Sequence, residues 1–320
     1  MDLSIVIPLY NEDESLPELM AWIDRVCRQD QGYDFEVVAV DDGSKDASWK
    51  VLTELQQQYP FIKGIRFRRN YGKSAALNEA FQAAKGEVVI TMDADLQDSP
   101  DEIPELMRMI REDGFDLVSG WKKVRHDPIT KTIPTKLYNG TQRLVTGIPL
   151  NDMNCGLKAY KNAVVKNVEV YGDMHRYIPV MAQAAGFKKI GEKVVVHQER
   201  KYGVTKFGME RFVNGLLDLM TIFFMSRFGK KPMHFFGSIG LLTFFLGGGI
   251  TFLIIIQKAW ALYGSGSKAV TLIAHQPLFF IALMLIIIGV QLFLAGFLGE
   301  IISRSAPDRN NYHISEKLNF

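Results

Sequence analysis

Two carboxylates one residue apart follow a short apolar segment of the sequence. Residues 88–92 read Val-Val-Ile-Thr-Met, and Asp93, Asp95 and Gln97 follow at alternate positions. Alternate residues of an extended chain lie on one side of it, so these three side chains can turn their oxygens toward one hard cation, which keeps other positions open for a diphosphate. The alternative is an acidic loop before a helix, because residues 98–100, Asp-Ser-Pro, are typical of a helix start.

Apolar segments alternate with amphipathic segments through the first 120 residues. We expect strands at 3–7, 35–40, 62–67, 88–92 and 116–119, and helices at 14–28, 46–58, 73–84 and 100–112. This alternation predicts an α/β fold with a mostly parallel sheet covered by helices on both faces. Ligands bind at the carboxyl ends of the strands in such sheets.

Polar side chains gather after each of the first four expected strands. They are Tyr10, Asn11 and Glu12, then Asp41 and Asp42, then Arg69 and Lys73, and then Asp93 and Asp95. A dinucleotide-binding enzyme is not indicated, because residues 8–12 read Pro-Leu-Tyr-Asn-Glu where G-x-G-x-x-G would stand. A nucleotide needs a contact for its base and ribose, cations for its diphosphate and a bridging metal, and this set offers each. Separately, each cluster could be a turn or a solvated face.

These motifs resemble glycosyltransferase family two, and within it the polyprenyl-phosphate glycosyltransferases, the group that contains dolichol-phosphate mannose synthase and bactoprenol glucosyltransferase. The resemblance rests on the ordered segments 6–12, 40–44, 69–76 and 93–97 and extends from residue 5 to about 207. It implies a GT-A-like catalytic domain, a nucleotide-sugar donor and a bound Mg²⁺ or Mn²⁺.

The resemblance also implies a role for each matching position. Asp41 and Asp42 would contact the base and ribose, and Asp93, Asp95 and Gln97 would hold the metal against the diphosphate. The residues expected to bind the donor are Pro8, Tyr10, Glu12, Asp41, Asp42, Arg69, Lys73, Asp93 and Lys122. Lys122 stands where the family has the arginine of a Gly-x-Arg, and it lacks the bidentate geometry of arginine.

The acceptor side is expected within residues 121–205. Asp152 matches an acidic position before a Gly-hydrophobic pair, and with Asp95 it is our candidate for a catalytic carboxylate; the alternative is a cap or turn residue. The family has a segment with an arginine, then a glycine, then Ser-Lys, and Arg200 and Lys206 match its arginine and its lysine. We expect these two residues to bind the acceptor phosphate. Ordinary positive charge near a membrane is the alternative for both. Cys155 is expected to be a buried small residue.

The composition changes after residue 206. Residues 207–228 form an amphipathic pattern, typical of a helix in the headgroup plane or of a core helix. The runs 235–256 and 278–298 carry no charge and are long enough to span a bilayer. Arginines and lysines flank the outer ends of these runs, so we expect both termini in the cytoplasm and the loop 257–277 on the far side of the inner membrane.

The sequence thus predicts four regions: a cytoplasmic catalytic domain at 1–206, a juxtamembrane amphipathic helix at 207–232, a two-helix transmembrane anchor at 233–304 and a cytoplasmic tail at 305–320. The three consecutive glycines 247–249 indicate close helix packing, and our hypothesis is that this packing joins subunits of a homo-oligomer. The net charge of +2 gives no general case for nucleic-acid binding. The two cysteines give no disulfide framework.

From these observations we expect a metal-dependent, inverting glycosyltransferase. It would transfer a sugar, glucose from UDP-glucose by the resemblance, to a membrane polyprenyl (undecaprenyl) phosphate, giving a lipid-linked sugar for cell-surface glycan modification. A GDP-mannose-dependent mannosyltransferase is the alternative within the group. A processive polysaccharide synthase is disfavoured, because the chain has no tryptophan between Trp121 and Trp260 to supply a Gln-x-x-Arg-Trp segment. A non-enzymatic membrane scaffold is the alternative from another class.

Overall fold

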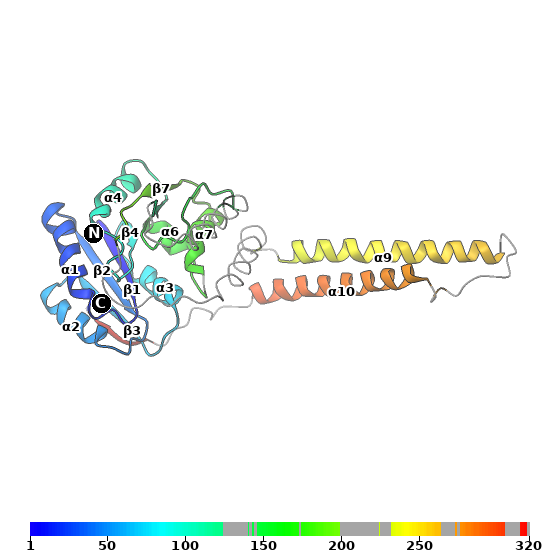
Figure 1. Ribbon diagram of the computed structural model, residues 1–320, viewed down its shortest axis with the longest axis horizontal. Coiled ribbons are helices and arrows are strands. Elements are labelled where there is room, and N and C mark those ends of the chain that lie inside the picture. The colour runs from blue at the N-terminus through cyan, green and yellow to red at the C-terminus, as the bar shows by residue number, and fades with distance from the viewer. Residues whose placement is uncertain are drawn as a thin grey trace. The chain divides into compact units, whose positions relative to one another are not determined.

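The computed structural model describes residues 1–123, 140, 143, 146–172, 174–198, 224, 232–263, 273, 276–304 and 314–318. The chain divides into two compact units (Figure 1). The first comprises Met1–Ser226 and Asp308–Phe320, and the second comprises Arg227–Pro307. The first unit holds a sheet with its covering helices, and the second holds two long helices.

In the described part of the chain, eight strands form one mixed sheet in the order β7-β5-β6-β4-β1-β2-β3-β8. The strands are β1 (Leu3–Leu9), β2 (Phe35–Asp41), β3 (Ile62–Phe67), β4 (Val88–Thr91), β5 (Leu117–Trp121), β6 (Lys158–Lys161), β7 (Ile190–Val194) and β8 (Ile314–Leu318). Strands β4, β1, β2 and β3 run parallel to their neighbours in this group. β6 is antiparallel to both β4 and β5. The expected GT-A-like fold with a parallel central sheet is confirmed.

The helices of this unit follow the strands as the sequence predicts. They are α1 (Leu16–Asp24) with a π-helical extension η1 (Arg25–Asp30), α2 (Ser48–Gln58), α3 (Lys73–Ala83), a 3₁₀ turn η2 (Pro100–Glu102) continuing into α4 (Ile103–Arg111), α6 (Asn162–Asn167), η3 (Met174–Tyr177) and α7 (Ile178–Ala184). The first five strands and the four helices expected from the sequence lie within two residues of the predicted bounds. Apolar periodicity therefore located the elements of the parallel half.

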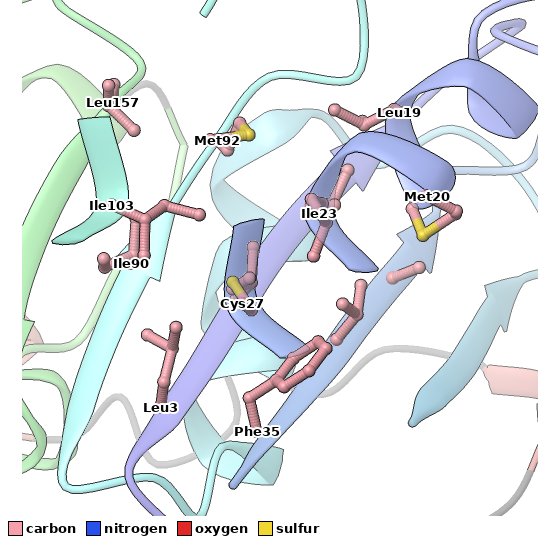
Figure 2. Close-up of a cluster of buried hydrophobic side chains, with 14 of the residues drawn as sticks. Leu3, Leu19, Met20, Ile23, Cys27, Phe35, Ile90, Met92, Ile103 and Leu157 are labelled. Atoms are coloured by element: carbon pink, nitrogen blue, oxygen red, sulfur yellow. The ribbon is translucent and has the colours of Figure 1, made fainter. Parts of the chain in front are cut away.

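Hydrophobic side chains cover both faces of the central strands. Along β2, Val37 and Ala39 belong to one apolar cluster, whereas Val38 and Val40 belong to another. The first cluster, shown in Figure 2, packs against α1, α2 and α4, and its members include Ile23. The second packs against α3, α6 and α7. This burial on both faces explains why the strands read as continuous apolar runs and not as alternating ones.

The C-terminal strand β8 was not expected from the sequence. Residues 314–318, assigned above to a cytoplasmic tail, pair antiparallel with β3 at the edge of the sheet. Leu318 packs against the first apolar cluster, and the indole Nε1 of Trp49 donates to Glu316 Oε2 at 2.9 Å. A segment of five residues with two apolar positions gives too weak a pattern to identify an edge strand.

The second unit consists of α9 (Pro232–Tyr263) and α10 (Pro277–Arg304), which pack side by side. Their long segments Pro232–Tyr263 and Pro277–Ile302 have mean hydropathies of 2.4 and 2.8, enough to cross a membrane. Only 17% and 11% of their most apolar windows are buried, so their apolar side chains mostly face outward, unlike those of a core helix. The predicted amphipathic helix at 207–228 lies outside the described residues except for Phe224.

Glycines bring the two long helices into close contact. A Cβ at Gly240 would lie 2.7 Å from the carbonyl oxygen of Gly289, and one at Gly247 would lie 2.6 Å from that of Ala282. Gly248 and Gly249 meet no atom within 4 Å in the described structure. Of the glycines 247–249, the first therefore serves packing within the hairpin, as small residues do between membrane helices.

Candidate active site

An open crevice lies where the carboxyl ends of β1, β2 and β4 meet. Its volume is about 320 Å³, within the range of small-molecule sites. It is lined by Pro8, Leu9, Tyr10, Glu12, Asp42, Asn70, Gly72, Lys73, Asp93, Ala94 and Asp95. The four polar clusters that the sequence places after four strands thus each contribute to one crevice.

The side chain of Asp42 joins two loops of the crevice wall. Its two carboxylate oxygens accept hydrogen bonds from the backbone N–H groups of Tyr71, at 2.7 Å, and Gly72, at 2.9 Å. Gly43 follows with φ +70°, and a Cβ there would lie 2.5 Å from the carbonyl carbon of Arg69, so only glycine allows this approach of the loops. Burial raises the pKa of Asp42.

The neighbouring Asp41 lies behind the crevice wall. Its side chain is fully buried, one oxygen accepts the N–H of Ser44 at 2.8 Å, and the other lies 3.6 Å from Arg66 Nε. Burial raises the pKa of Asp41. The residues that line the described crevice include Asp42 but not Asp41, so the two adjacent acids occupy different positions.

At the end of β4, Asp93 forms an ion pair with Lys73, the first residue of α3. Both side chains are one-third exposed, at 33%. Burial acts to raise the pKa of Asp93, but the adjacent Lys73 ammonium outweighs it and lowers the pKa, keeping the carboxylate ionised. The backbone of Gly156 passes close to Asp93, since a Cβ there would lie 2.5 Å from Oδ2. Thr91 Oγ1 fixes this loop by donating to the Gly156 carbonyl at 2.8 Å.

The loop after Asp93 turns sharply and is held from outside. Leu96 adopts a left-handed conformation with φ +61°, and the N–H of Gln97 donates to Asp95 Oδ1 at 3.2 Å. The carbonyl of Gln97 accepts the N–H of Gln198 at 3.0 Å, and Asp98 forms a β-bridge with His197. The segment at 197–198, for which the sequence gave no signal, therefore positions the loop that carries Asp95.

The donor set of the crevice fits a hard divalent cation. Asp93 and Asp95 line the same open space, and carboxylate oxygens are the ligands that Mg²⁺ and Mn²⁺ prefer. Among the described residues, no group of three or more His, Cys, Asp and Glu side chains is arranged for a metal. Further ligands would therefore come from water and from substrate oxygens; Gln97, expected as a third ligand, is not among the residues that line the crevice.

Besides Asp41 and Gln97, three more expected site residues lie apart from the crevice lining. Arg69 is exposed, and its guanidinium stacks on the ring of Tyr71 at 4.5 Å. The ammonium group of Lys122 forms an ion pair with Asp98, with its nitrogen 2.8 Å from Oδ1. The side chain of Asp98 is fully buried. Asp152 is buried, and its Oδ1 accepts the N–H of Asn154 at 3.2 Å, the geometry of the turn residue considered above as its alternative role.

The two expected acceptor residues, Arg200 and Lys206, lie outside the described residues. Cys155 is buried, and burial raises the pKa of its thiol to about 12, so it is a protonated small side chain, as the sequence indicated. Cys27 is likewise buried, with its pKa raised by burial to about 12.

Basic residues to which the sequence gave no ligand role gather beside Asp93; of these, His175 was expected to be a structural histidine. A second, smaller cavity shares Pro8, Lys73 and Asp93 with the crevice, and its lining adds Lys158, Arg176 and His175. Burial, together with the charges of Lys73 and Arg176, lowers the pKa of His175 to about 3, so its imidazole is neutral at pH 7. Its Nδ1 lies 3.0 Å from Ser74 Oγ. Lys158 is the first residue of the four-residue strand β6, and no local pattern in the sequence predicts that it lies beside a ligand site.

Comparison with known proteins decides the family. Residues 4–168 match glycosyl transferase family 2. The chain belongs to this family. A dodecaprenyl-phosphate galacturonate synthase from Rhizobium johnstonii is 32% identical over 310 residues, which cover 95% of this chain and 88% of the relative. An undecaprenyl-phosphate 4-deoxy-4-formamido-L-arabinose transferase from Pseudomonas fluorescens is 36% identical over 261 residues, 81% of this chain and 76% of that protein. This glycosyltransferase therefore has polyprenyl-phosphate sugar transferases among its relatives, as its motifs indicated.

The fold also resembles solved structures. The glucosyl-3-phosphoglycerate synthase from Mycobacterium tuberculosis, in complex with Mn²⁺, uridine diphosphate and glucosyl-3-phosphoglycerate, superposes with a TM-score of 0.53. The match covers 70% of this chain and 79% of that chain at 17% sequence identity. At this identity the likeness establishes the fold of the glycosyltransferase and not its substrates.

Proposed function

We propose that this glycosyltransferase transfers one sugar from a nucleotide-sugar to the phosphate of a membrane polyprenol. The observation that carries the proposal is the convergence of Asp42, Asp93 and Asp95 on one crevice, in a chain that continues into two apolar helices long enough to span a bilayer. A soluble donor would bind in the crevice, and the hairpin would keep the enzyme at the surface where the lipid acceptor lies.

In the proposed reaction, an oxygen of the acceptor phosphate attacks the anomeric carbon of the donor sugar. A bond forms between that oxygen and the carbon, the bond to the donor diphosphate breaks, and the nucleoside diphosphate leaves. A phosphate monoester is largely ionised at pH 7, because its second pKa is about 6, so it needs no strong base. Attack opposite the leaving group inverts the anomeric centre. Positioning of the two substrates then contributes much of the rate enhancement.

The roles of the crevice residues follow from their placement. Asp93 and Asp95, with Gln97, would hold Mg²⁺ or Mn²⁺, which when bound stabilises the charge of the departing diphosphate. Lys73 keeps Asp93 ionised and directed into the crevice. Asp42 holds the wall beside the nucleotide. We assign the acceptor phosphate to Arg200 and Lys206 on the family motif, and Asp152 to the turn that shapes the acceptor side.

For the donor we propose a UDP-sugar. The sequence motifs favoured glucose, and GDP-mannose as the alternative, whereas the printed names of the relatives specify galacturonate and 4-deoxy-4-formamido-L-arabinose. Glucose transfer therefore remains a prediction. The test is a panel of UDP-glucose, UDP-galacturonate, UDP-4-deoxy-4-formamido-L-arabinose and GDP-mannose with polyprenyl phosphate, in which formation of a lipid-linked sugar is measured with and without Mn²⁺. If no donor of the panel supports transfer, the proposed function is refuted, and the alternative of a non-enzymatic scaffold is favoured.

We also propose an inner-membrane location with the catalytic unit and both termini in the cytoplasm, where nucleotide-sugars are made. The positive residues flanking the two helices support this orientation. The strand β8 supports one part of this proposal, the location of both ends of the hairpin on one side of the membrane, because β8 follows α10 in the chain and pairs with β3, which precedes α9.

A further inference from the structure

The loop that carries Asp95 is held at Asp98, shortly before the loop enters η2. The side chain of Asp98 is fully buried, and that of Lys122, which directly follows β5, is only 15% exposed. The ammonium nitrogen of Lys122 lies 2.8 Å from Asp98 Oδ1. This ion pair joins the loop after β4 to the end of β5, although β6 separates these two strands in the sheet.

The charge of Asp98 depends on Lys122. Within the part of the chain that the structure describes, Asp98 forms no other ion pair, and its buried Oδ2 accepts no hydrogen bond. Burial acts to lower the pKa of Lys122, but the charge of Asp98 outweighs burial and raises it, so the lysine stays protonated. A buried carboxylate that loses its charged partner is strongly unfavourable. Asp98 is therefore stable in this place only with Lys122 beside it.

The position of Asp98 determines where the carboxylate of Asp95 lies. The two residues belong to one tight turn, in which Leu96 is left-handed with φ +61° and the N–H of Gln97 donates to Asp95 Oδ1 at 3.2 Å. Asp98 also forms the β-bridge with His197. A displacement of Asp98 would move this turn, and the crevice-lining carboxylate of Asp95 would move with it.

The same ion pair opposes a direct contact between Lys122 and the donor. Lys122 is not among the residues that line the crevice. To reach a diphosphate there, its ammonium group would have to leave Asp98, and the buried carboxylate would then lose its compensating charge. The geometry therefore favours an indirect role for Lys122.

We propose that Lys122 is a positioning residue, which acts through Asp98 to hold Asp95 where it can bind the metal and which makes no contact with the donor. The inference departs from the expectation that Lys122 binds the donor itself. It rests on the proposed function, because that function assigns the metal to Asp93 and Asp95.

The test is a double-mutant cycle at the ion pair in the full-length enzyme. Its variants are Lys122→Met, Asp98→Asn and the two changes combined. Each single change leaves one charge without its partner, whereas the double change leaves none, and loss of both partners of a buried pair is often tolerated. The matched control is Lys123→Met, because Lys123 is the next residue, is exposed and lies 5.7 Å from the ring centroid of Trp121.

Three quantities are measured for each protein. The affinity for Mn²⁺ in the presence of UDP is obtained from the electron paramagnetic resonance signal of free Mn²⁺. The affinity for UDP without metal is measured by calorimetry in the presence of a chelator. Hydrogen exchange of the amides of residues 94–98 reports on the loop itself, without metal or nucleotide.

We expect Lys122→Met to weaken Mn²⁺ binding about 10–100-fold, as is typical for residues that orient a metal ligand. Hydrogen exchange of residues 94–98 should be faster, and the metal-free affinity for UDP should stay within about twofold of the wild type. The double variant should bind Mn²⁺ about fivefold or more tightly than Lys122→Met, because no unpaired buried charge then displaces the loop. Lys123→Met should match the wild type in all three measurements.

Asp98→Asn provides a second, independent comparison, because it frees Lys122 to contact the donor. This variant should also weaken Mn²⁺ binding; tighter binding of UDP would instead identify Lys122 as a ligand and overturn the inference. Two results for Lys122→Met would overturn it as well: unchanged Mn²⁺ affinity with unchanged exchange, or a loss of metal-free UDP affinity that the double variant does not restore. If the wild type binds no Mn²⁺ with UDP, the metal role in the proposed function is refuted, and hydrogen exchange still decides whether Lys122 holds the loop.

Discussion

Asp93 and Asp95 line the same crevice but have different surroundings. Asp93 is tied to Lys73 and packed against the backbone of Gly156, whereas Asp95 Oδ1 accepts the N–H of Gln97 in the turn that follows. A cation that entered the crevice would therefore compete with the Lys73 ammonium group for Asp93. The two acids of the motif are thus expected to respond differently to substitution.

Asp95→Ala should abolish turnover and leave the fold intact. Removal of a ligand to the metal removes stabilisation of the leaving diphosphate, a contribution of several kcal/mol, so we expect a loss of about 100-fold or more. The side chain lies in an open loop, and its loss should change the stability by no more than about 0.5 kcal/mol. Turnover and melting temperature are compared with those of Asp101→Ala, an exposed carboxylate outside the crevice. Near-normal activity of Asp95→Ala in the presence of a chelator would show that Asp95 binds no metal.

Gly156→Ala tests whether the backbone positions Asp93. The added Cβ would lie 2.5 Å from Asp93 Oδ2, so the carboxylate or the loop must move. Such overpacking costs about 1–3 kcal/mol, and we expect the Mn²⁺ concentration for half-maximal activity to rise about tenfold or more. Gly248→Ala adds the same methyl group where no atom lies within 4 Å and serves as the control. An unchanged Mn²⁺ requirement in Gly156→Ala would show that Asp93 does not depend on this contact.

His175 should make the protein less stable in acid. Burial and the charges of Lys73 and Arg176 lower its pKa to about 3 in the fold, against an ordinary value of about 6.5. Between these values the unfolded chain binds a proton that the folded chain does not, so stability present above pH 6.5 is lost as the pH falls. The melting temperature between pH 7.5 and 4.5 should therefore fall less in His175→Gln, which can still bond to Ser74, than in the wild type. If the melting temperatures of the two proteins fall equally with pH, His175 is not the cause of the loss of stability in acid.

At the scale of elements, the sequence predicted one half of the sheet well. The parallel strands are buried on both faces, so each appears as an apolar run of its own, and turns between them are rich in polar residues. β6, β7 and β8 were missed, and each pairs with a strand distant in sequence. Their register depends on tertiary contacts, for which a single sequence carries no periodic signal.

The same contrast applies to the site. The acids of the crevice were predicted because each directly follows a recognisable strand, as Asp42 and Asp93 do. Lys122 and Asp152 were expected to contact a substrate because of motif matching alone. In the structure, Lys122 pairs with Asp98, and Asp152 accepts the N–H of Asn154. Lys158 and His197 were missed, since their proximity to the Asp93 loop is created by β6 and by the bridge at Asp98.

The edge strand β8 should stabilise the catalytic unit. Leu318 packs against the apolar cluster beneath β3, and Glu316 accepts from Trp49. Because Leu318 is only half-buried, we expect Leu318→Ala to cost about 1–2 kcal/mol, less than a fully buried leucine, and to lower the melting temperature. Lys317→Ala, at an exposed position of the same strand, is the control. A melting temperature equal to that of the control would mean that β8 adds nothing to the stability of the sheet.

At the scale of the whole molecule, β8 changes how the anchor must be studied. A chain that ends before α9 loses the hairpin and also the last strand of the catalytic sheet. Such a truncation exposes the edge of β3, and exposed edges favour aggregation. A loss of donor binding in a truncated protein could then arise from the damaged sheet and not from the missing membrane helices. The role of the anchor is better tested by its topology in the intact chain.

Because β3 pairs with β8, we expect the chain to cross the membrane an even number of times between these strands. With α9 and α10 as the two proposed spans, we predict that residues 264–275 lie on the opposite side of the membrane from the catalytic unit. The native Cys27 and Cys155 are buried, so new thiols can be labelled against a low background. In spheroplasts, a membrane-impermeant maleimide should label Ser265→Cys in this loop but not Glu54→Cys on the exposed surface of α2, until the membrane is broken. Labelling of Glu54→Cys in intact spheroplasts would place the catalytic unit outside, away from cytoplasmic nucleotide-sugars. If neither cysteine is labelled in intact spheroplasts, the hairpin does not cross the membrane. The enzyme would then reach the lipid acceptor from one face of the bilayer without a spanning anchor.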